Sequence, residues 1–308
     1  MTLLAIVSTA VLCGEPAAKA EMKQESESGI THTFIVFGGD TFRVGKDSKV
    51  EWKYPHGSRD GYAMPNGNVL MALSHDNATG KYPGGAIVEV DKDNKTVFDF
   101  KGAQAEVHSV QPLENGNIVM TEGGPKPKLM EITREGKVVV EFPLQCQVPN
   151  AHMQTRMARK LPNGNYLVPH LLDHAVKEYK PDGTIVAEFK TPLEPKDAWP
   201  FTAIRLENGN TYINLTHSNT VEEVDKDGKV VWQLTNKDLP APLLNDPCGA
   251  QRLANGNTII CSYGAGAPDA VKAFEVTPEK KVVWTFKTGN GSKIHEIHVI
   301  DPGEKSLK

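Results

Sequence analysis

Histidines and arginines that could bind a ligand recur at one equivalent position of an internally repeated sequence. The position lies five residues before each of five short motifs, which begin at Met64, Leu113, Leu161, Leu206 and Leu253, and five residues before Ile300. The residues found there are Arg59, His108, Arg156, Phe201, Cys248 and His295. Neutral imidazole binds transition metals and accepts protons, and guanidinium binds carboxylate, phosphate or sulfate in bidentate fashion. Whether these side chains act together depends on the fold that positions them.

Each of the five motifs ends in Asn-Gly-Asn and predicts a β-hairpin. From the first Asn of one motif to that of the next, the steps are 49, 48, 45 and 47 residues. Asn-Gly favours a tight turn with positive φ at both of its residues, and between apolar runs it is a strong hairpin signal. The chain therefore repeats one hairpin-containing unit of about 47 residues.

A second motif, two alternating strands joined by a charged turn, occurs six times. Its extra copy is N-terminal, at residues 42–52, with no inner strand before it, whereas residues 294–300 read as an inner strand with no turn after it. We therefore predict an all-β fold: one six-bladed β-propeller over residues 21–308, with four antiparallel strands in each blade. The C-terminal strand should complete the N-terminal blade and close the ring without an open edge. A β-sandwich is the rival fold, but sandwiches do not repeat at this period.

Three of the four tryptophans, Trp52, Trp232 and Trp284, occupy the same place in the outermost strand of their repeats. A shared place in the repeat indicates packing between neighbouring blades rather than stacking on a cofactor.

One face of the predicted disc carries most of the chemistry. Strand direction alternates within a blade, so the links between blades and the loops after the second strands fall on the same face. Nearly all of the 10 histidines map there. The candidate ligand-binding residues are Arg59, Arg156, His108, His152, His295, His56 and His217. If the protein is an enzyme, its catalytic candidates are His108, His152 and His295. Polar lining of a wet channel, without chemistry, is the alternative interpretation.

The ligand class follows from the mixture of residue types. A ring of histidines suggests a bound transition metal, but fixed positive charges beside a cation are unfavourable. Arg59 and Arg156 alternate with the histidines, and this combination suits a small anion better. A metal stays the second candidate. Calcium is disfavoured because no compact set of carboxylates occupies the inner positions.

The N-terminal 20 residues resemble a secretory signal. Residues 3–12 form an apolar run too short to span a bilayer, and Ala18-Lys19-Ala20 offers a signal peptidase site. We predict cleavage after Ala20 and a secreted or periplasmic protein that is not transmembrane, with a lipid anchor on Cys13 as the alternative. The formal net charge of −4, with no block of like charge, gives no support to nucleic-acid binding.

Three cysteines remain after cleavage: Cys146, Cys248 and Cys261. An odd and small number shows that disulfides are not the framework of the fold. Cys248 and Cys261 flank one Asn-Gly turn on the same face of a hairpin, two residues out of direct opposition. They either form a bridge or stay small buried thiols.

The repeats carry a family resemblance. The segment His108-Ser109-Val110-Gln111-Pro112-Leu113-Glu114-Asn115-Gly116-Asn117, together with Lys229-Val230-Val231-Trp232, resembles the repeats of secreted bacterial PQQ-like propellers. It is also similar to the repeats of arylsulfotransferase-type six-bladed propellers. Quinoprotein dehydrogenases hold their quinone with a stacked tryptophan and calcium in eight-bladed rings. With six blades and no repeat that docks a tryptophan, we expect no PQQ and predict no cofactor.

The second resemblance implies histidine chemistry. Arylsulfotransferases place histidine and arginine at the central channel and pass a sulfuryl group through a histidine. By position, this implies His108, His152 or His295 as the nucleophile, with Arg59 and Arg156 binding the anion.

Three functional hypotheses follow. The leading one is a propeller that holds a small, anionic ligand at the central channel. The second is a histidine-dependent group transferase or lyase. The third is a protein-interaction scaffold, which predicts a flat face without a pocket and an exposed apolar patch around Trp199 and Phe201.

Overall fold

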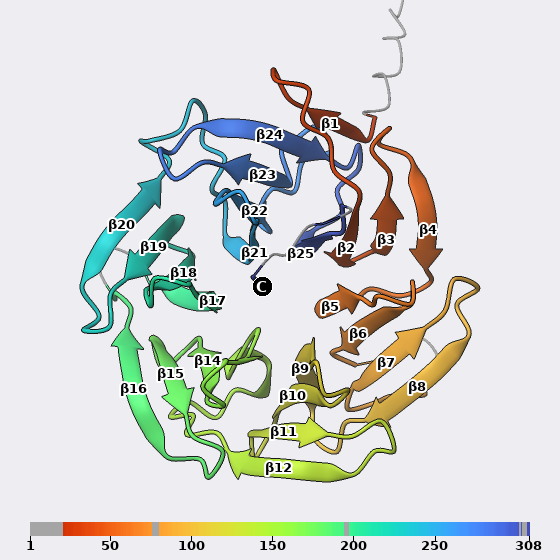
Figure 1. The fold of residues 1–308 in the computed structure, drawn as a ribbon, viewed down its shortest axis with the longest axis vertical. Coiled ribbons are helices and arrows are strands. Elements are labelled where there is room, and N and C mark those ends of the chain that lie inside the picture. The colour runs from red at the N-terminus through yellow and green to blue at the C-terminus, as the bar shows by residue number, and fades with distance from the viewer. Residues whose placement is uncertain (1–20, 76–79, 194–196, 302, 304–306) are drawn as a thin grey trace, which may run out of the picture.

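Six antiparallel sheets form a ring around a central axis (Figure 1). The computed structural model describes residues 21–75, 80–193, 197–301, 303 and 307–308. Five sheets have four strands, and the sixth has five. The predicted six-bladed propeller is therefore confirmed. Residues 1–20, and with them the predicted signal peptide and Cys13, lie outside the described residues.

Within each blade the strands lie side by side, and their order runs from the centre of the ring to its rim. Three blades consist of β5 (Asp60–Ala63), β6 (Val69–Leu73), β7 (Ala86–Val90) and β8 (Thr96–Lys101); β9 (Glu106–Pro112), β10 (Ile118–Gly123), β11 (Lys128–Ile132) and β12 (Val138–Pro143); and β13 (Arg159–Lys160), β14 (Tyr166–His170), β15 (Ala175–Tyr179) and β16 (Ile185–Lys190). The next two consist of β17 (Trp199–Arg205), β18 (Thr211–Thr216), β19 (Thr220–Val224) and β20 (Val230–Thr235); and β21 (Pro247–Arg252), β22 (Thr258–Ser262), β23 (Ala273–Val276) and β24 (Val282–Lys287).

The last blade joins the two ends of the chain. Its strands are β25 (Ile294–Val299), β2 (Phe34–Gly38), β3 (Thr41–Val44) and β4 (Val50–Tyr54), in that order from the centre. The C-terminal strand β25 pairs with β2 in antiparallel register, with Phe34 opposite Val299. The predicted closure is therefore confirmed, and it leaves no free sheet edge where the ring meets itself.

A short N-terminal strand, β1 (Lys23–Glu25), adds a fifth strand to the rim of the preceding blade. It pairs with β24, and the indole Nε1 of Trp284 donates a hydrogen bond of 2.9 Å to Gln24. This strand was not predicted, because its three residues do not belong to the repeat. It covers the outer edge of one blade.

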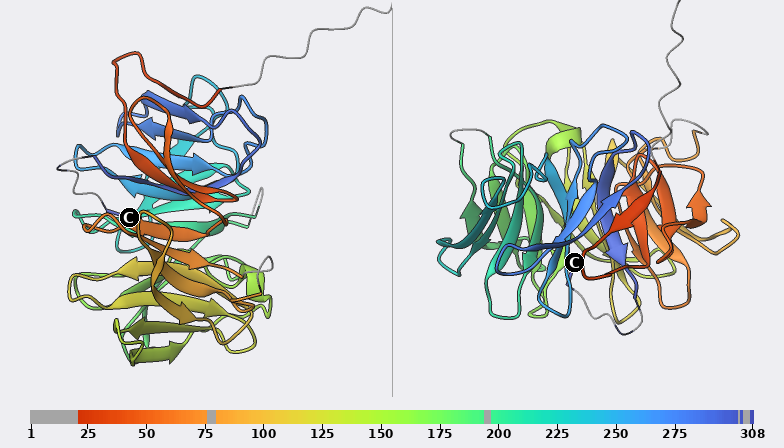
Figure 2. Two further views of the ribbon diagram at one scale, coloured as in Figure 1. Left: turned by 90° about the vertical axis from the view of Figure 1, so that its right-hand side faces the viewer. Right: turned by 90° about the horizontal axis from the view of Figure 1, so that it is seen from above.

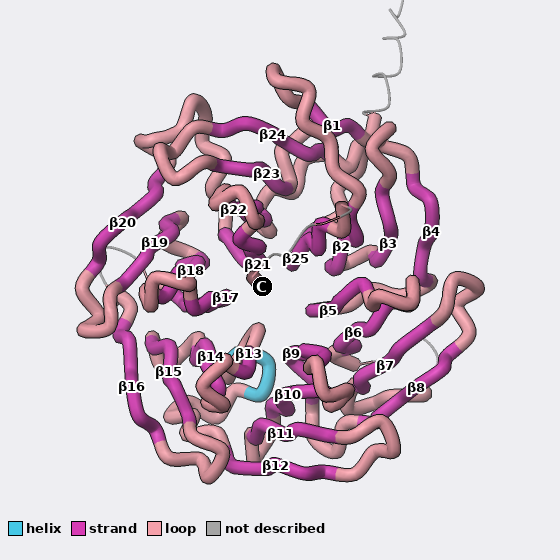
Figure 3. Tube along the Cα trace, viewed as in Figure 1, coloured by secondary structure: helices cyan, strands magenta, loops and turns pink. Residues whose placement is uncertain are grey.

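The two faces of the disc differ. The 3₁₀ helix η1 (Ala151–Met153) stands out against the strands and loops of the trace (Figure 3), and it lies on the face opposite the C-terminus (Figure 2). We call this the η1 face, and the face with the Asn-Gly motifs the turn face. No helix in the described part of the chain is long and apolar enough to span a membrane.

The Asn-Gly turns differ from the predicted type. Positive φ occurs at Gly67 and its four equivalents, whereas Asn66 is not among the residues with positive φ. Met64 N–H donates to Asn68 O, and Gly67 N–H donates to Met64 O. This is a three-residue loop in which a type I turn is followed by a left-handed glycine. Only the glycine has positive φ, so the prediction of positive φ at the preceding asparagine was wrong.

The last Asn of the motif has a structural role that explains its recurrence. The side-chain amide of Asn68 donates to Glu89 in the third strand of the same blade, at 2.7 Å. Equivalent bonds join Asn117 to Glu131, Asn165 to Glu178 and Asn257 to Glu275. Each bond satisfies a carboxylate that is largely buried between blades.

Apolar side chains fill the spaces between adjacent blades. Trp52, Trp232 and Trp284 lie in the fourth strands β4, β20 and β24, as expected. Trp284 is fully buried and makes edge contacts with Phe34, with ring centroids 5.7 Å apart. These tryptophans stabilise the packing of neighbouring blades.

His32 links the closing blade to its neighbour. Its Nδ1 lies 2.7 Å from Asp301 Oδ2, and its Nε2 lies 2.9 Å from Glu275 Oε2. Burial by itself would lower the pKa of His32, but the hydrogen bonds to Glu275 and Asp301 hold this pKa above its usual value. A protonated His32 therefore joins two carboxylates from different parts of the chain.

Replacement of His32 by glutamine should destabilise the protein in a pH-dependent way. A raised pKa in the folded state contributes stability that is complete below the unfolded pKa, about 6.5, and is lost as pH rises through the folded value. We expect His32→Gln to lower the free energy of unfolding in urea by about 1–3 kcal/mol at pH 6 and by less at pH 9. A loss that is equal at both pH values, or larger at pH 9, would contradict this role.

Candidate functional site

Local irregularities of the inner strands create the candidate site. In β9, Val107 and Ser109 pair with the adjacent residues Glu122 and Thr121, so His108 is the extra residue of a β-bulge. The pairing of β17 skips Phe201 and that of β25 skips His295 in the same way. A bulge turns a side chain away from the alternation of a regular strand, and bulges are frequent next to functional sites. The register of β21 shifts across Cys248 as well, so four of the six equivalent positions lie at such irregularities.

Glycines make room for two of these bulges. A Cβ atom on Gly123 would lie 2.2 Å from Cε1 of His108, and a Cβ on Gly38 would lie 2.2 Å from the carbonyl oxygen of Lys293. Both approaches are closer than any side chain allows, so only glycine permits the backbone to approach so closely there.

Glu106 lies at the centre of the cluster on the η1 face. Nη2 of Arg59 lies 3.2 Å from Glu106 Oε2, and Nδ1 of His152 lies 3.0 Å from Glu106 Oε1. Nε2 of His108 is 3.6 Å from the same carboxylate. The structure therefore brings three of the candidate residues around one acidic group, which was not among the predicted site residues.

The charges of the cluster set its protonation states. Partial burial would raise the pKa of Glu106, but the imidazoles of His108 and His152 and the charge of Arg59 hold this pKa well below its usual range. Burial and the nearby charges of Arg156 and Arg59 lower the pKa of His108 to about 3. At neutral pH the site thus contains a carboxylate and a neutral His108.

His295 is neutral for the same reasons. Burial of its ring, together with the charges of Arg59 and Arg156, lowers its pKa well below the usual value. Its ring stacks on Tyr263 with centroids 4.7 Å apart and an interplanar angle of 19°. Its Nδ1 is buried without a hydrogen-bond partner among the described residues.

Arg156 is a buried cation without an acidic partner in the described part of the chain. Its Nη1 donates to the carbonyl oxygen of Thr155 at 2.7 Å, and its guanidinium lies 5.5 Å from the ring centroid of Phe201. The side chain is 3% exposed. Burial and then the charge of Arg59 lower the pKa of Arg156 well below its usual value. A guanidinium held this way is unfavourable unless an anion approaches it.

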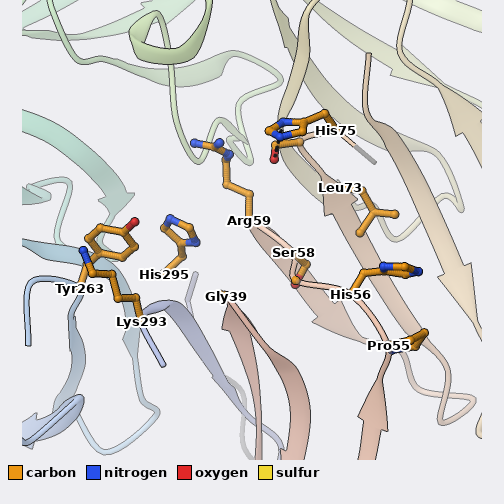
Figure 4. Close-up of a pocket in the computed structure, with 13 residues that line it drawn as sticks. Gly39, Pro55, His56, Ser58, Arg59, Leu73, His75, Tyr263, Lys293 and His295 are labelled. Carbon is orange, nitrogen blue, oxygen red and sulfur yellow. Dashed lines mark hydrogen bonds between the residues drawn. The ribbon is translucent and has the colours of Figure 1, made fainter. Parts of the chain in front are cut away.

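A pocket of about 610 Å³ opens beside this cluster (Figure 4). Its 13 lining residues include Arg59, Lys293, His56, His75 and His295. None of these described lining residues is an aspartate or a glutamate. Figure 4 shows Arg59 and His295 reaching toward its centre, with Tyr263 and Lys293 on one side and His56 on the other. Such a lining attracts anions.

The remaining predicted residues are distributed unevenly. His56 lines the pocket. His217 stacks on Trp199 with centroids 3.8 Å apart, and no contact joins it to Glu106 among the described residues. His170 lies 3.0 Å from Tyr179 OH and 3.4 Å from Cys146 Sγ, in a separate buried cluster.

Phe201 and Cys248 fill the apolar side of the channel. Both are buried and belong to one apolar cluster with Met157 and Leu171. These two inner positions are therefore packed in an apolar cluster rather than exposed in a wet channel. Cys146, Cys248 and Cys261 are free thiols, so the bridge between Cys248 and Cys261 is not formed.

A second charged network closes the channel on the turn face. Arg159 binds Asp60 through two hydrogen bonds, of 2.8 and 3.0 Å, and Nζ of Lys308 lies 3.2 Å from Glu296. Asp60 and Glu296 directly follow the pocket residues Arg59 and His295. The described part of the chain contains no group of three or more histidine, cysteine or acidic side chains that could hold a metal ion.

Lys293 and Tyr263 line the pocket but were not predicted as site residues. Neither stands at the repeated inner position: Tyr263 follows the second strand of its blade, and Lys293 precedes β25. Glu106 was also not predicted as a site residue, although its place two residues before His108 could have indicated it. Its central role became visible only with the contacts.

The fold and the pocket together define a six-bladed β-propeller with a basic pocket at its channel mouth. The chain belongs to the Mal s 1 allergenic protein-like family, whose model matches residues 24–237. The resemblance to PQQ-like and arylsulfotransferase-type repeats stays a prediction beside this match. No match was found among curated proteins.

Solved structures share the fold. A protein of unknown function from Bacteroides caccae has a TM-score of 0.76 and 20% identity, covering 88% of this chain and 100% of its own. A catalytically inactive virginiamycin B lyase from Staphylococcus aureus with quinupristin has a TM-score of 0.52 and 14% identity, covering 86% and 74%. A putative 6-phosphogluconolactonase from Bacteroides fragilis has a TM-score of 0.55 and 14% identity, covering 90% and 100%. At these identities the likeness concerns the fold alone.

Replacement of Glu106 by glutamine should destabilise the protein at neutral pH. The change removes the carboxylate that offsets Arg59, so we expect a loss of about 1–3 kcal/mol in urea unfolding at pH 7. Because the pKa of Glu106 is lowered, its contribution is present above the unfolded pKa, about 4.3, and declines as pH falls below it. Glu114→Gln, at an exposed position of the next turn, is the control. Equal stability of both variants would contradict the role of Glu106.

Proposed function

We propose that the protein is a secreted or periplasmic propeller that binds a small anionic ligand at the mouth of its channel, on the η1 face. The observation that carries this proposal is a pocket that contains Arg59 and Lys293 but no acidic lining residue among those described. The proposed secreted or periplasmic location rests on residues 1–20 of the sequence, which resemble a secretory signal. The ligand is a carboxylate, phosphate or sulfate, the groups that guanidinium recognises.

The balance of charge beside the pocket supports an anion over a metal. Glu106 offsets one of the two buried guanidinium groups, and Arg156 is left without a carboxylate among the described residues. Folding gains nothing from burying such a charge, since an unpaired buried ion costs several kcal/mol. A bound anion would supply the missing partner, whereas a metal ion would add to the repulsion.

Catalysis is the second candidate, favoured by the contact between Glu106 and His152. Because the ionised Glu106 can only accept hydrogen bonds, Nδ1 of His152 must donate. In the neutral ring this leaves Nε2 free to accept a proton, and the side chain is 54% exposed. A carboxylate that orients a histidine in this way is a common arrangement of general bases. Turnover of an aryl sulfate or a sugar lactone, lost in His152→Ala, would establish this function.

The scaffold hypothesis receives less support. It predicts a flat face and an exposed apolar patch, but Phe201 is 5% exposed and a pocket is present.

Replacement of Arg156 by methionine should weaken anion binding without a loss of stability. Methionine keeps apolar contact with Phe201 and removes the unpaired charge. We expect the affinity for sulfate and phosphate, measured by calorimetry, to fall at least tenfold, about 1.4 kcal/mol. The free energy of unfolding should stay equal or rise by about 1 kcal/mol.

Arg159→Met is the matched control for stability. Arg159 lies three residues away with similar burial, 4% exposed, but binds Asp60. Its replacement leaves the buried carboxylate of Asp60 without this partner and should lower the free energy of unfolding by about 3–5 kcal/mol. If Arg156→Met binds sulfate as well as wild type, or destabilises the fold as much as Arg159→Met, the proposed function is wrong.

A further inference from the structure

The two permanent cations of the pocket lie at different depths. Arg59 is 5% exposed, and its Nε is buried without a hydrogen-bond partner among the described residues. Lys293 is exposed at the rim, where its Nζ lies 4.7 Å from the ring centroid of Tyr263. The deep end and the rim of the pocket therefore each present a cation.

The rings of Tyr263 and His295 separate these cations. Figure 4 shows Lys293 beside Tyr263 and Arg59 on the far side of His295. The two rings stack with centroids 4.7 Å apart. If a single carboxylate were bound to Arg59, the ammonium group of Lys293 would contact only the ring of Tyr263 and would have no anionic partner among the described residues. The pocket, at about 610 Å³, also has room for much more than one inorganic ion.

Each end of the pocket has one positive charge in excess. At the deep end Arg59 and the adjoining Arg156 face one carboxylate, Glu106. At the rim Lys293 forms no ion pair with a described residue. Two single negative charges, held apart, would neutralise both ends, whereas one doubly charged group would neutralise only the end it touches.

We propose that the ligand is a small organic dianion with two separated acidic groups, such as a dicarboxylate, held by Arg59 at the deep end and by Lys293 at the rim. Its carbon spacer lies along the rings of Tyr263 and His295, which supply an apolar surface of fixed orientation. This inference rests on the proposed anion-binding function and adds the number and spacing of the charges.

Calorimetry with acetate and with malonate, succinate, glutarate and adipate, at constant ionic strength, tests the spacing. Binding of a dicarboxylate to two cations should peak at one chain length, with an affinity at least tenfold above that of acetate. Inorganic phosphate, with its charge on one group, should bind more weakly than the best dicarboxylate. Dicarboxylates that bind no better than acetate or phosphate would overturn the inference.

Lys293→Met and Lys287→Met are the paired variants. Lys287 pairs with Glu25 at the rim of a blade, outside the pocket. Lys293→Met should reduce the affinity for the best dicarboxylate more than tenfold and that for acetate much less, whereas Lys287→Met should leave both unchanged. An equal loss for both ligands in Lys293→Met contradicts two-point binding. If acetate binds in a way that depends on Arg156, but no dicarboxylate binds more tightly than acetate, only this inference is wrong. If no anion binds, the proposed function itself is wrong.

Discussion

The pairing of β25 with β2 is the constraint on which the rest of the structure depends. It joins residues 294–299 to residues 34–38 and closes the ring, so that every blade packs between two neighbours. The same pairing places the bulged His295 beside Arg59, although the two residues are far apart in the chain. Without closure there would be an open sheet edge and no pocket, because its two sides come from the first and last parts of the propeller.

The closed ring then buries more positive than negative charge at one end of its axis. On the turn face Arg159 and Lys308 each lie beside an acidic side chain, Asp60 and Glu296 respectively. On the η1 face Glu106 pairs with Arg59 and leaves Arg156 without a carboxylate among the described residues, and burial together with the two guanidinium charges keeps His108 and His295 neutral. A protein stabilised only for folding would use an apolar residue at Arg156. The difference between the two ends is the main physical argument that the η1 face binds an anion.

The repeat made the fold predictable, whereas the site was predictable only in outline. Five Asn-Gly motifs at a similar spacing indicated the blades, and the incomplete repeats at both ends indicated the closure. The equivalent position groups Arg59, His108, Arg156 and His295 on one face, because repeated blades place this position at a similar height along the axis. Lys293 and Tyr263 were not predicted because they lie in linking segments that do not repeat. Bulge positions and ion pairs such as that between Arg59 and Glu106 depend on contacts between blades, which the hydrophobic pattern does not encode. The short strand β1 was missed for the same reason.

Anomalous diffraction from crystals soaked in selenate would show whether the pocket binds an anion, because selenium marks the position of a bound oxyanion. We expect a selenium peak in the pocket on the η1 face, within contact distance of the Arg59 guanidinium or Lys293 Nζ. We also expect a weaker peak there in crystals of the Arg156→Met variant. Selenate peaks confined to the outer surface of the propeller, with the pocket empty at the same concentration, would contradict anion binding at this site.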